Sequence, residues 1–234
     1  ITSKTSAILL TTPHNPTGAI LTADDIEAIG KLALQHDLWI ISDEVYKELI
    51  FDGSTFATPL SRPELADRTI VVSSISKSHA APGFRSGWCI GPVAFTETLL
   101  ALSETMLFGN QPFIADMTEK AIRDGSSVAR GMRERYAARA ERLRQRLSEE
   151  TKLIVHQPNA GMFAMIEVSA TGLNGRDYAL HLLEHGGVAV MPGESFGATL
   201  NGWVRVALTV DDVAFDRACD RIVKHANRLQ LEAA

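Results

Sequence analysis

Short apolar runs and amphipathic stretches alternate along the first half of the chain. Runs rich in Ile, Val and Leu lie at residues 7–10, 38–42 and 69–73, and an apolar Trp-Cys-Ile run lies within residues 86–91, which is typical of buried strands. Between the first two, Thr22 and Asp25 have the spacing of a capping box, which predicts a helix to about His36. Strands that alternate with helices indicate a two-sided α/β fold with a mostly parallel sheet.

Helices dominate the middle of the chain. Residues 93–123 have a helical pattern that is broken at Gly109–Pro112, and a long helix is predicted over residues 127–150. Five apolar residues of the long helix recur at steps of three or four and form one stripe: Met132, Tyr136, Ala140, Leu143 and Leu147. Glutamates interleave with its seven arginines, so we interpret the basic face as solvated and not as a nucleic-acid patch.

The pattern changes after Thr151 to shorter elements. Strands are predicted near residues 153–156, 162–168, 188–190 and 203–207, and helices near 175–185 and 211–230. This is an α+β layer with a sheet of its own. We therefore expect two domains, a large domain over residues 1–145 and a C-terminal small domain over residues 146–234, with the boundary inside the long helix.

Composition and residue spacing argue against several classes of function. The net charge of −5 over 234 residues gives no support to nucleic-acid binding by bulk electrostatics. No apolar run reaches the roughly 18–20 residues that span a bilayer, so no membrane partner is expected. Cys89 and Cys219 have no metal-ligand spacing and are interpreted as reduced core thiols of a cytoplasmic protein. The histidines show no metal-binding pattern, so no metal site is expected.

Polar residues that could bind a ligand or take part in catalysis follow three of the predicted strands. A lysine forms Schiff bases once its pKa is depressed, and an arginine with nearby hydroxyls suits a phosphate. An aspartate at the carboxyl end of a buried parallel strand lies where such sheets bind ligands. Together these groups suit pyridoxal phosphate. Simpler interpretations are a solvated lysine, a helix-capping aspartate and a strand-to-helix loop. The residues are Asn15, Asp43, Tyr46, Ser74, Lys77 and Arg85.

The order and spacing of these motifs resemble a known family. N-P-T-G at 15–18, S-D-E-V-Y at 42–46, and S-I-S-K at 74–77 with G-F-R-S-G at 83–87 resemble the class I/II pyridoxal-phosphate-dependent aminotransferases, which have the aspartate aminotransferase-like fold type I. The resemblance continues through residues 158–163, 192–197 and 204–206 and covers essentially the whole chain. Within the family it is similar especially to bacterial transaminases of the arginine–pyruvate kind.

The resemblance implies a role for each site residue. Lys77 would form a Schiff base with the cofactor and then act as general base and acid in the 1,3-proton shift. Asp43 would pair with the protonated pyridine nitrogen, and Tyr46 would donate to the phenolic oxygen. Ser74 and Arg85 would bind the phosphate. Lys77, Asp43 and Tyr46 are thus the expected catalytic residues.

Two further residues are expected to meet cofactor or substrate. Asn15 would donate to the cofactor's phenolic oxygen, and its peptide bond to Pro16 is predicted to be cis. Arg205, a lone charge in Trp-Val-Arg-Val, would bind the substrate α-carboxylate; the alternative is a salt bridge at the strand edge. Phe163 and Phe196 are candidates either for the pocket mouth or for the core.

The implied activity is amino-group transfer between an L-amino acid and a 2-oxo acid, by a homodimer. Two alternatives keep the same cofactor residues: a C–S β-lyase, and the ligand-sensing domain of a transcription regulator. Family members also have a preceding segment with a Gly-rich phosphate loop and an aromatic residue that stacks on the cofactor. This chain enters the family pattern midway, at Ile1, so a third expectation is that the fragment alone is inactive.

Overall fold

The computed structural model describes residues 1–51, 53–107 and 109–232, and the chain divides into two compact units. The first unit contains residues 1–14 and 19–133, and the second contains residues 15–18 and 134–234. The division lies inside α5 (Ser127–Glu150), the same helix in which the sequence predicted a domain boundary. It falls between Arg133 and Glu134, whereas the sequence placed it near residue 145.

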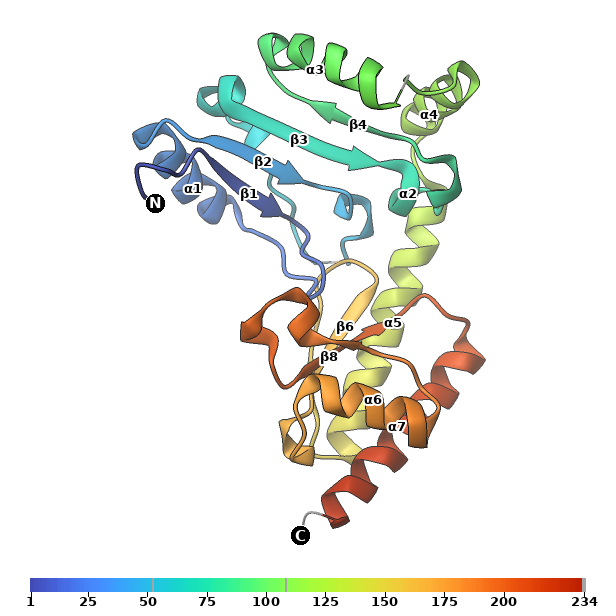
Figure 1. Cartoon of the computed structure of the whole chain (residues 1–234). Coiled ribbons are helices and arrows are strands. Elements are labelled where there is room, and N and C mark those ends of the chain that lie inside the picture. Colours follow the sequence, from blue (N-terminus) through green and yellow to red (C-terminus); the bar gives the residue numbers. More distant parts are fainter. Residues whose placement is uncertain (52, 108, 233–234) are drawn as a thin grey trace. The chain divides into compact units, whose positions relative to one another are not determined.

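One four-stranded sheet organises the first unit, in the order β1-β2-β3-β4 (Figure 1). Its first three strands are parallel, and the last is antiparallel to its neighbour. The sheet is therefore mostly parallel, as predicted. The strands are β1 (Ala7–Thr11), β2 (Trp39–Asp43), β3 (Thr69–Ser74) and β4 (Gly87–Ile90).

Helices of the first unit begin and end where local signals predict. Thr22 and Asp25 exchange the two hydrogen bonds of a capping box at the start of α1. Side chains of α1 pack with those of β1 and β2 in one buried cluster that includes Leu10, Ile26 and Ile40. The elements are α1 (Ala23–Gln35), α2 (Ile75–Ser78), α3 (Val93–Leu107) and α4 (Pro112–Asp124), with short 3-10 segments η1 (Lys47–Leu49), η2 (Pro59–Ser61), η3 (Pro63–Arg68) and η4 (Pro82–Phe84).

An antiparallel sheet in the order β5-β6-β8-β7 organises the second unit. The prediction of a strand near residues 188–190 was wrong, because the short strand in this region starts at Met191. Val188 and Val190 instead line an apolar groove against Phe215 of α7, so their apolar character reflects packing and not strand pairing. The strands are β5 (Ile154–His156), β6 (Phe163–Glu167), β7 (Met191–Pro192) and β8 (Trp203–Ala207).

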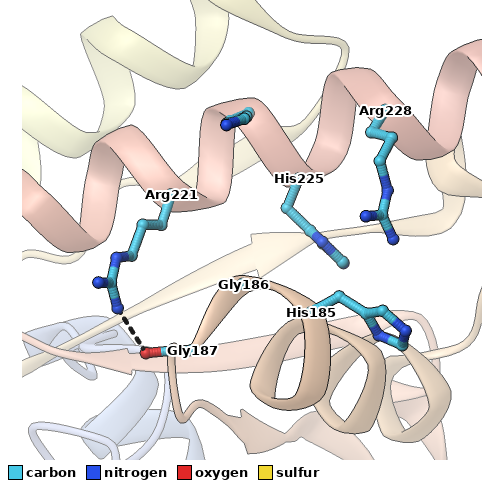
Figure 2. Close-up of a pocket in the computed structure, with 7 residues that line it drawn as sticks. His185, Gly186, Gly187, Arg221, His225 and Arg228 are labelled. Carbon is cyan, nitrogen blue, oxygen red and sulfur yellow. Dashed lines mark hydrogen bonds between the residues drawn. The ribbon is translucent and has the colours of Figure 1, made fainter.

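The helices of the second unit are the remainder of α5, α6 (Gly175–Gly186) and α7 (Asp212–Glu232), with 3-10 segments η5 (Ser169–Thr171), η6 (Gly193–Phe196) and η7 (Ala198–Leu200). All five members of the apolar stripe predicted on α5 are buried. Helices α6 and α7 lie side by side, with the ring of His225 turned toward α6 (Figure 2).

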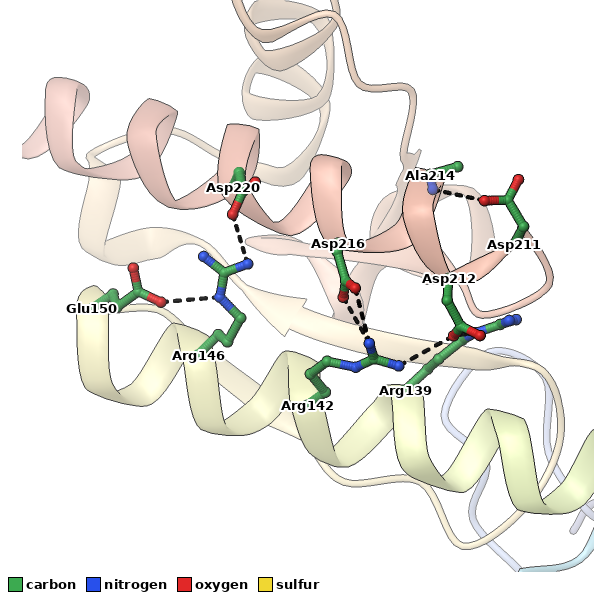
Figure 3. A network of polar contacts seen from close by, with 9 residues as sticks. All are labelled: Arg139, Arg142, Arg146, Glu150, Asp211, Asp212, Ala214, Asp216 and Asp220. Carbon is green, nitrogen blue, oxygen red and sulfur yellow. Dashed lines mark hydrogen bonds and ion pairs between the residues drawn. The ribbon is translucent and has the colours of Figure 1, made fainter.

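A row of ion pairs joins α5 to α7 (Figure 3). Acidic residues recur every four positions along α7 and meet arginines of α5 within 3 Å: Arg139–Asp212, Arg142–Asp216 and Arg146–Asp220. Arg139 is buried and also donates to the carbonyl oxygen of Leu208, at 2.7 Å. The interpretation of the arginine-rich face as solvated was therefore wrong for Arg139, because it weighed only the glutamates of the same helix; Arg142 and Arg146 are paired but partly exposed.

The two cysteines differ in exposure. Cys219 is buried in α7, as predicted, but Cys89 is exposed, so its assignment to the core was wrong. Cys89 lies on β4, which is an edge strand of its sheet, and an apolar sequence there does not ensure burial. Among the described residues, no helix has the length and apolar character needed to cross a bilayer.

Candidate functional site

The carboxyl ends of β2 and β3 bring several predicted site residues to one edge of the first unit's sheet. Asp43 is the last residue of β2 and pairs in register with Val72 of β3. Ser74 ends β3, and the chain turns directly into α2, which carries Lys77. The strands therefore deliver a carboxylate, a hydroxyl and an amine to the same edge.

Asp43 and Tyr46 lie on the turn that follows β2. The Oδ1 atom of Asp43 accepts a hydrogen bond from the backbone N–H of Val45 at 3.1 Å, which fixes the half-buried carboxylate. Tyr46 is buried and stands immediately before η1. Because α2 packs against η1, the segment after Tyr46 and the helix of Lys77 are direct neighbours.

Ser74 and Lys77 are held by the short helix α2. Ser74 caps this helix: its Oγ accepts from the backbone N–H of Ser76 at 3.3 Å, so its own O–H can donate to a ligand. Lys77 is half-buried in the same turn.

His79, to which the sequence gave no role, anchors this turn. Its Nε2 atom lies 3.0 Å from the carbonyl oxygen of Ala121 in α4. A carbonyl only accepts, so Nε2 carries the proton, and Nδ1 accepts from the hydroxyl of Ser78 at 2.8 Å. The residue that follows Lys77 is thereby tied to α4 through one imidazole. No sequence signal identified this contact, because Ala121 contributes only its backbone.

Arg85 lies in a turn that a hydrogen bond between two hydroxyls stabilises. It has a left-handed backbone with φ of 52°, and its Nη1 donates to the carbonyl oxygen of Pro82 at 2.9 Å. The next residue, Ser86, is buried and shares a 2.7 Å hydrogen bond with Thr118 of α4. The turn is therefore fixed while the Arg85 guanidinium stays exposed with further N–H donors.

Asn15 and Arg205 meet within the second unit. The Oδ1 atom of Asn15 accepts from Nη1 of Arg205 at 2.9 Å, and the peptide bond between Asn15 and Pro16 is cis, as predicted. The guanidinium carbon of Arg205 lies 3.9 Å from the ring centroid of Phe163 and 4.7 Å from that of Phe196. Both phenylalanines therefore position Arg205, a role that neither of the two predicted alternatives described.

A close packing contact explains the glycine of the N-P-T-G motif. Gly18 has φ of 73°, and a Cβ atom there would lie 2.4 Å from the Cβ of Pro158 and 2.6 Å from the carbonyl oxygen of Ala160. The carbonyl oxygen of Gly18 also accepts from the backbone N–H of Asn159 at 3.1 Å. The loop that carries Asn15 is thus seated on residues 158–160, which belong to another motif of the resemblance.

Glu44 shows that one acidic residue of the S-D-E-V-Y motif is structural. It is buried and accepts from the hydroxyls of Thr58 at 2.6 Å and Ser42 at 3.2 Å. Burial raises the pKa of the Glu44 carboxyl above its ordinary value, and these hydrogen bonds oppose that shift. Neighbouring acids thus differ: Asp43 is half-buried at the strand end, and Glu44 fixes the turn beneath it.

The predicted site residues therefore form two sets. Asp43, Tyr46, Ser74, Lys77 and Arg85 belong to the first unit, whereas Asn15 and Arg205 belong to the second. Comparison with known proteins identifies the family of the chain. Residues 1–222 match the family model of aminotransferase class I and II, and the chain belongs to this family.

Named relatives agree with the family assignment. The chain is 41% identical over 229 residues to arginine–pyruvate transaminase AruH of Pseudomonas aeruginosa, a match that covers 98% of this chain and 58% of that protein. An aromatic aminotransferase from Pyrococcus horikoshii OT3 superposes with a TM-score of 0.93 at 29% identity, over 99% of this chain and 62% of that one. A PLP-bound putative aminotransferase from Clostridium difficile 630 gives a TM-score of 0.88 at 26% identity, over 95% and 58%.

Proposed function

We propose that this chain forms the lysine-bearing part of a pyridoxal-phosphate-dependent aminotransferase, which moves an amino group between an L-amino acid and a 2-oxo acid. One observation carries the proposal: Lys77 follows β3 directly at the sheet edge where Asp43 ends β2. The chain spans 58% of the length of its transaminase relative, so the activity is proposed for the whole protein.

The chemistry of the donor set fits this cofactor. The exposed guanidinium of Arg85 and the hydroxyl of Ser74 would bind its phosphate, because both donate hydrogen bonds to an anion. The Asp43 carboxylate would pair with the ring nitrogen, and the Tyr46 phenol would donate to the ring oxygen. When bound, pyridoxal phosphate supplies a carbonyl carbon for the Schiff base with Lys77 and a ring that withdraws electrons from the substrate.

Proton transfer would fall to the side chain of Lys77. As a free amine, its Nζ would remove the proton from the substrate Cα and would then return it, so that one side chain would serve as base and acid in the 1,3-proton shift. His79 would keep the turn of Lys77 in place during both steps, through its contacts with Ser78 and Ala121.

The second unit would contribute Arg205 and Asn15. Arg205 would bind the substrate α-carboxylate, because its guanidinium, which two aromatic rings contact, has a planar fork of N–H groups that can donate to both carboxylate oxygens. Asn15 already uses its amide oxygen to accept from Arg205, so its NH₂ group is the part that would donate to the cofactor oxygen.

Two properties of the whole protein are also proposed. A homodimer is supported by exposed apolar side chains on α3, where Val93 is 72% and Met106 is 67% exposed. A cytoplasmic location is supported by the two free thiols, Cys89 and Cys219.

Trapping the cofactor tests the proposal without depending on turnover. The chain is mixed with pyridoxal phosphate, reduced with borohydride, digested and analysed by mass spectrometry. The pyridoxyl adduct is expected on Lys77, lost in Lys77→Ala, and kept in Lys47→Ala, a control in the neighbouring segment η1. An adduct that persists elsewhere in Lys77→Ala at the wild-type level would contradict the assignment.

In the active protein, Lys77→Ala should reduce turnover by several orders of magnitude, because its covalent and its acid–base roles are both lost. The wild-type reaction should require a 2-oxo acid acceptor. Pyruvate and ammonia released from a cysteine conjugate without an acceptor would indicate a β-lyase instead.

A further inference from the structure

A pocket of about 400 Å³ lies between the last turn of α6 and the C-terminal half of α7 (Figure 2). Apart from two glycines, every residue that lines it is a lysine, an arginine or a histidine, and none is acidic. This pocket lies wholly within the second unit and contains none of the residues assigned to the aminotransferase reaction. The side chains that matter are Arg221, Lys224, Arg228, His185 and His225.

The three basic residues share one face of α7. Arg221, Lys224 and Arg228 are spaced by three and four residues, so their side chains project over the same side of the helix. Arg221 donates to the carbonyl oxygen of Gly187 at 3.0 Å, just beyond the end of α6. The C-terminal end of a helix carries only about half a negative charge, so the full positive charge of Arg221 exceeds the charge at the end of α6.

Positive charge therefore remains around the pocket. Within the described residues, neither Arg221 nor Lys224 forms an ion pair. Three acids of α7, Asp212, Asp216 and Asp220, instead meet arginines of α5 (Figure 3). Helix α7 thus directs these three acids toward α5 and the three pocket bases toward the end of α6, in a chain whose net charge is −5.

The histidines give the pocket a fixed wall. His225 is only 4% exposed, and its Nε2 lies 3.2 Å from Nδ1 of His181. His181 in turn stacks on His185, with ring centroids 4.1 Å apart. A mobile, solvated basic surface would not include a buried imidazole held in this way, so these contacts distinguish the pocket from a merely basic helix face.

We propose that this pocket binds a small anion that bears two or more phosphate groups. From Arg221 to Lys224 to Arg228 the cationic side chains are spread over seven residues, or roughly 10 Å of helix. A single orthophosphate reaches only part of this span, whereas linked phosphates can meet the guanidinium fork of Arg221 and the ammonium of Lys224 together. This ligand class is independent of the proposed aminotransferase reaction.

Isothermal titration of the chain with pyrophosphate tests the proposal. Pyrophosphate is expected to bind at least about tenfold more tightly than orthophosphate, and added salt should weaken binding. Lys224→Ala and Arg228→Gln should each weaken pyrophosphate binding about tenfold. The matched control is Arg217→Gln, which removes an exposed arginine one turn earlier on α7 that does not line this pocket, and it should leave binding unchanged.

A second control separates this pocket from the proposed cofactor site. Arg85→Gln should leave pyrophosphate binding intact, because Arg85 belongs to the first unit. Loss of binding in Arg85→Gln, with none in Lys224→Ala, would overturn the proposal. So would unchanged affinity in both α7 pocket variants, provided that circular dichroism shows them folded, or no measurable heat with the wild-type chain.

Discussion

At the scale of single residues, Arg205 illustrates how a half-buried cation is oriented for a ligand. Two aromatic rings lie against its guanidinium and one amide oxygen accepts from it, so the guanidinium is oriented before any ligand arrives. Arginine suits this position because its planar head stacks on aromatic rings while its edges remain donors. Lysine offers a point charge without such a plane.

This setting gives a prediction for Arg205. In the active protein, Arg205→Ala should lower kcat/KM for the amino acid and the 2-oxo acid alike, by on the order of 2–5 kcal/mol in transition-state free energy. Affinity for pyridoxal phosphate should change little, and Arg205→Lys should restore only part of the loss. Steady-state kinetics with both substrates, and cofactor titration, measure these effects. A change within a few-fold for both substrates would rule out carboxylate binding by Arg205.

The residue scale also shows which parts of the candidate site the sequence could reveal. The placement of Asp43, Ser74 and Lys77 at one sheet edge was predictable because each lies at or just after the end of an apolar strand, and the ends of parallel strands meet at one edge. The stacking of Phe163 and Phe196 on Arg205 was not predictable, because these residues lie far apart along the chain and each also has the character of a core residue. Contacts to a backbone carbonyl, such as that of His79, leave no sequence signal.

At the scale of elements, the boundaries that depend on local chemistry were predicted well. The capping box at Thr22, the break before α4 and the apolar stripe of α5 all depend on neighbours within a few residues. The errors concern tertiary partners. Arg139 of α5 was interpreted as solvated because its acidic partner, Asp212, lies about seventy residues later, on α7.

The ion pairs between α5 and α7 differ in burial, which gives a prediction for stability (Figure 3). The Arg139 side chain is 6% exposed, whereas that of Arg142 is 36% exposed. Arg139→Leu should cost about 2–3 kcal/mol in the free energy of unfolding, because the carbonyl oxygen of Leu208 loses a buried hydrogen bond and Asp212 keeps only the more distant of its two arginine partners, Arg142. Arg142→Leu, the matched control, should cost about 1 kcal/mol or less. Urea denaturation measures both, and equal losses would contradict the role of burial.

At the scale of the whole molecule, apolar surface is distributed unevenly. Helix α3 has exposed apolar side chains at Val93, Leu100, Leu102 and Met106, and none of its side chains that the structure describes is fully buried. A helix of this composition gains little stability from propensity alone and depends on packing of its apolar side chains. The exposed apolar side chains of α3 are therefore expected to promote association of the chain in water.

Dye binding and molecular mass test this property. The 234-residue chain should bind an apolar fluorescent dye and self-associate with rising concentration, because association removes exposed apolar surface from water. Leu100→Glu with Met106→Glu should reduce both signals several-fold, since these side chains are 63% and 67% exposed and their replacement leaves the core intact. Val213→Glu changes a side chain on α7 that is 74% exposed, and it should have little effect. Light scattering that shows a concentration-independent monomer, together with dye fluorescence equal in all three proteins, would show that α3 does not drive association.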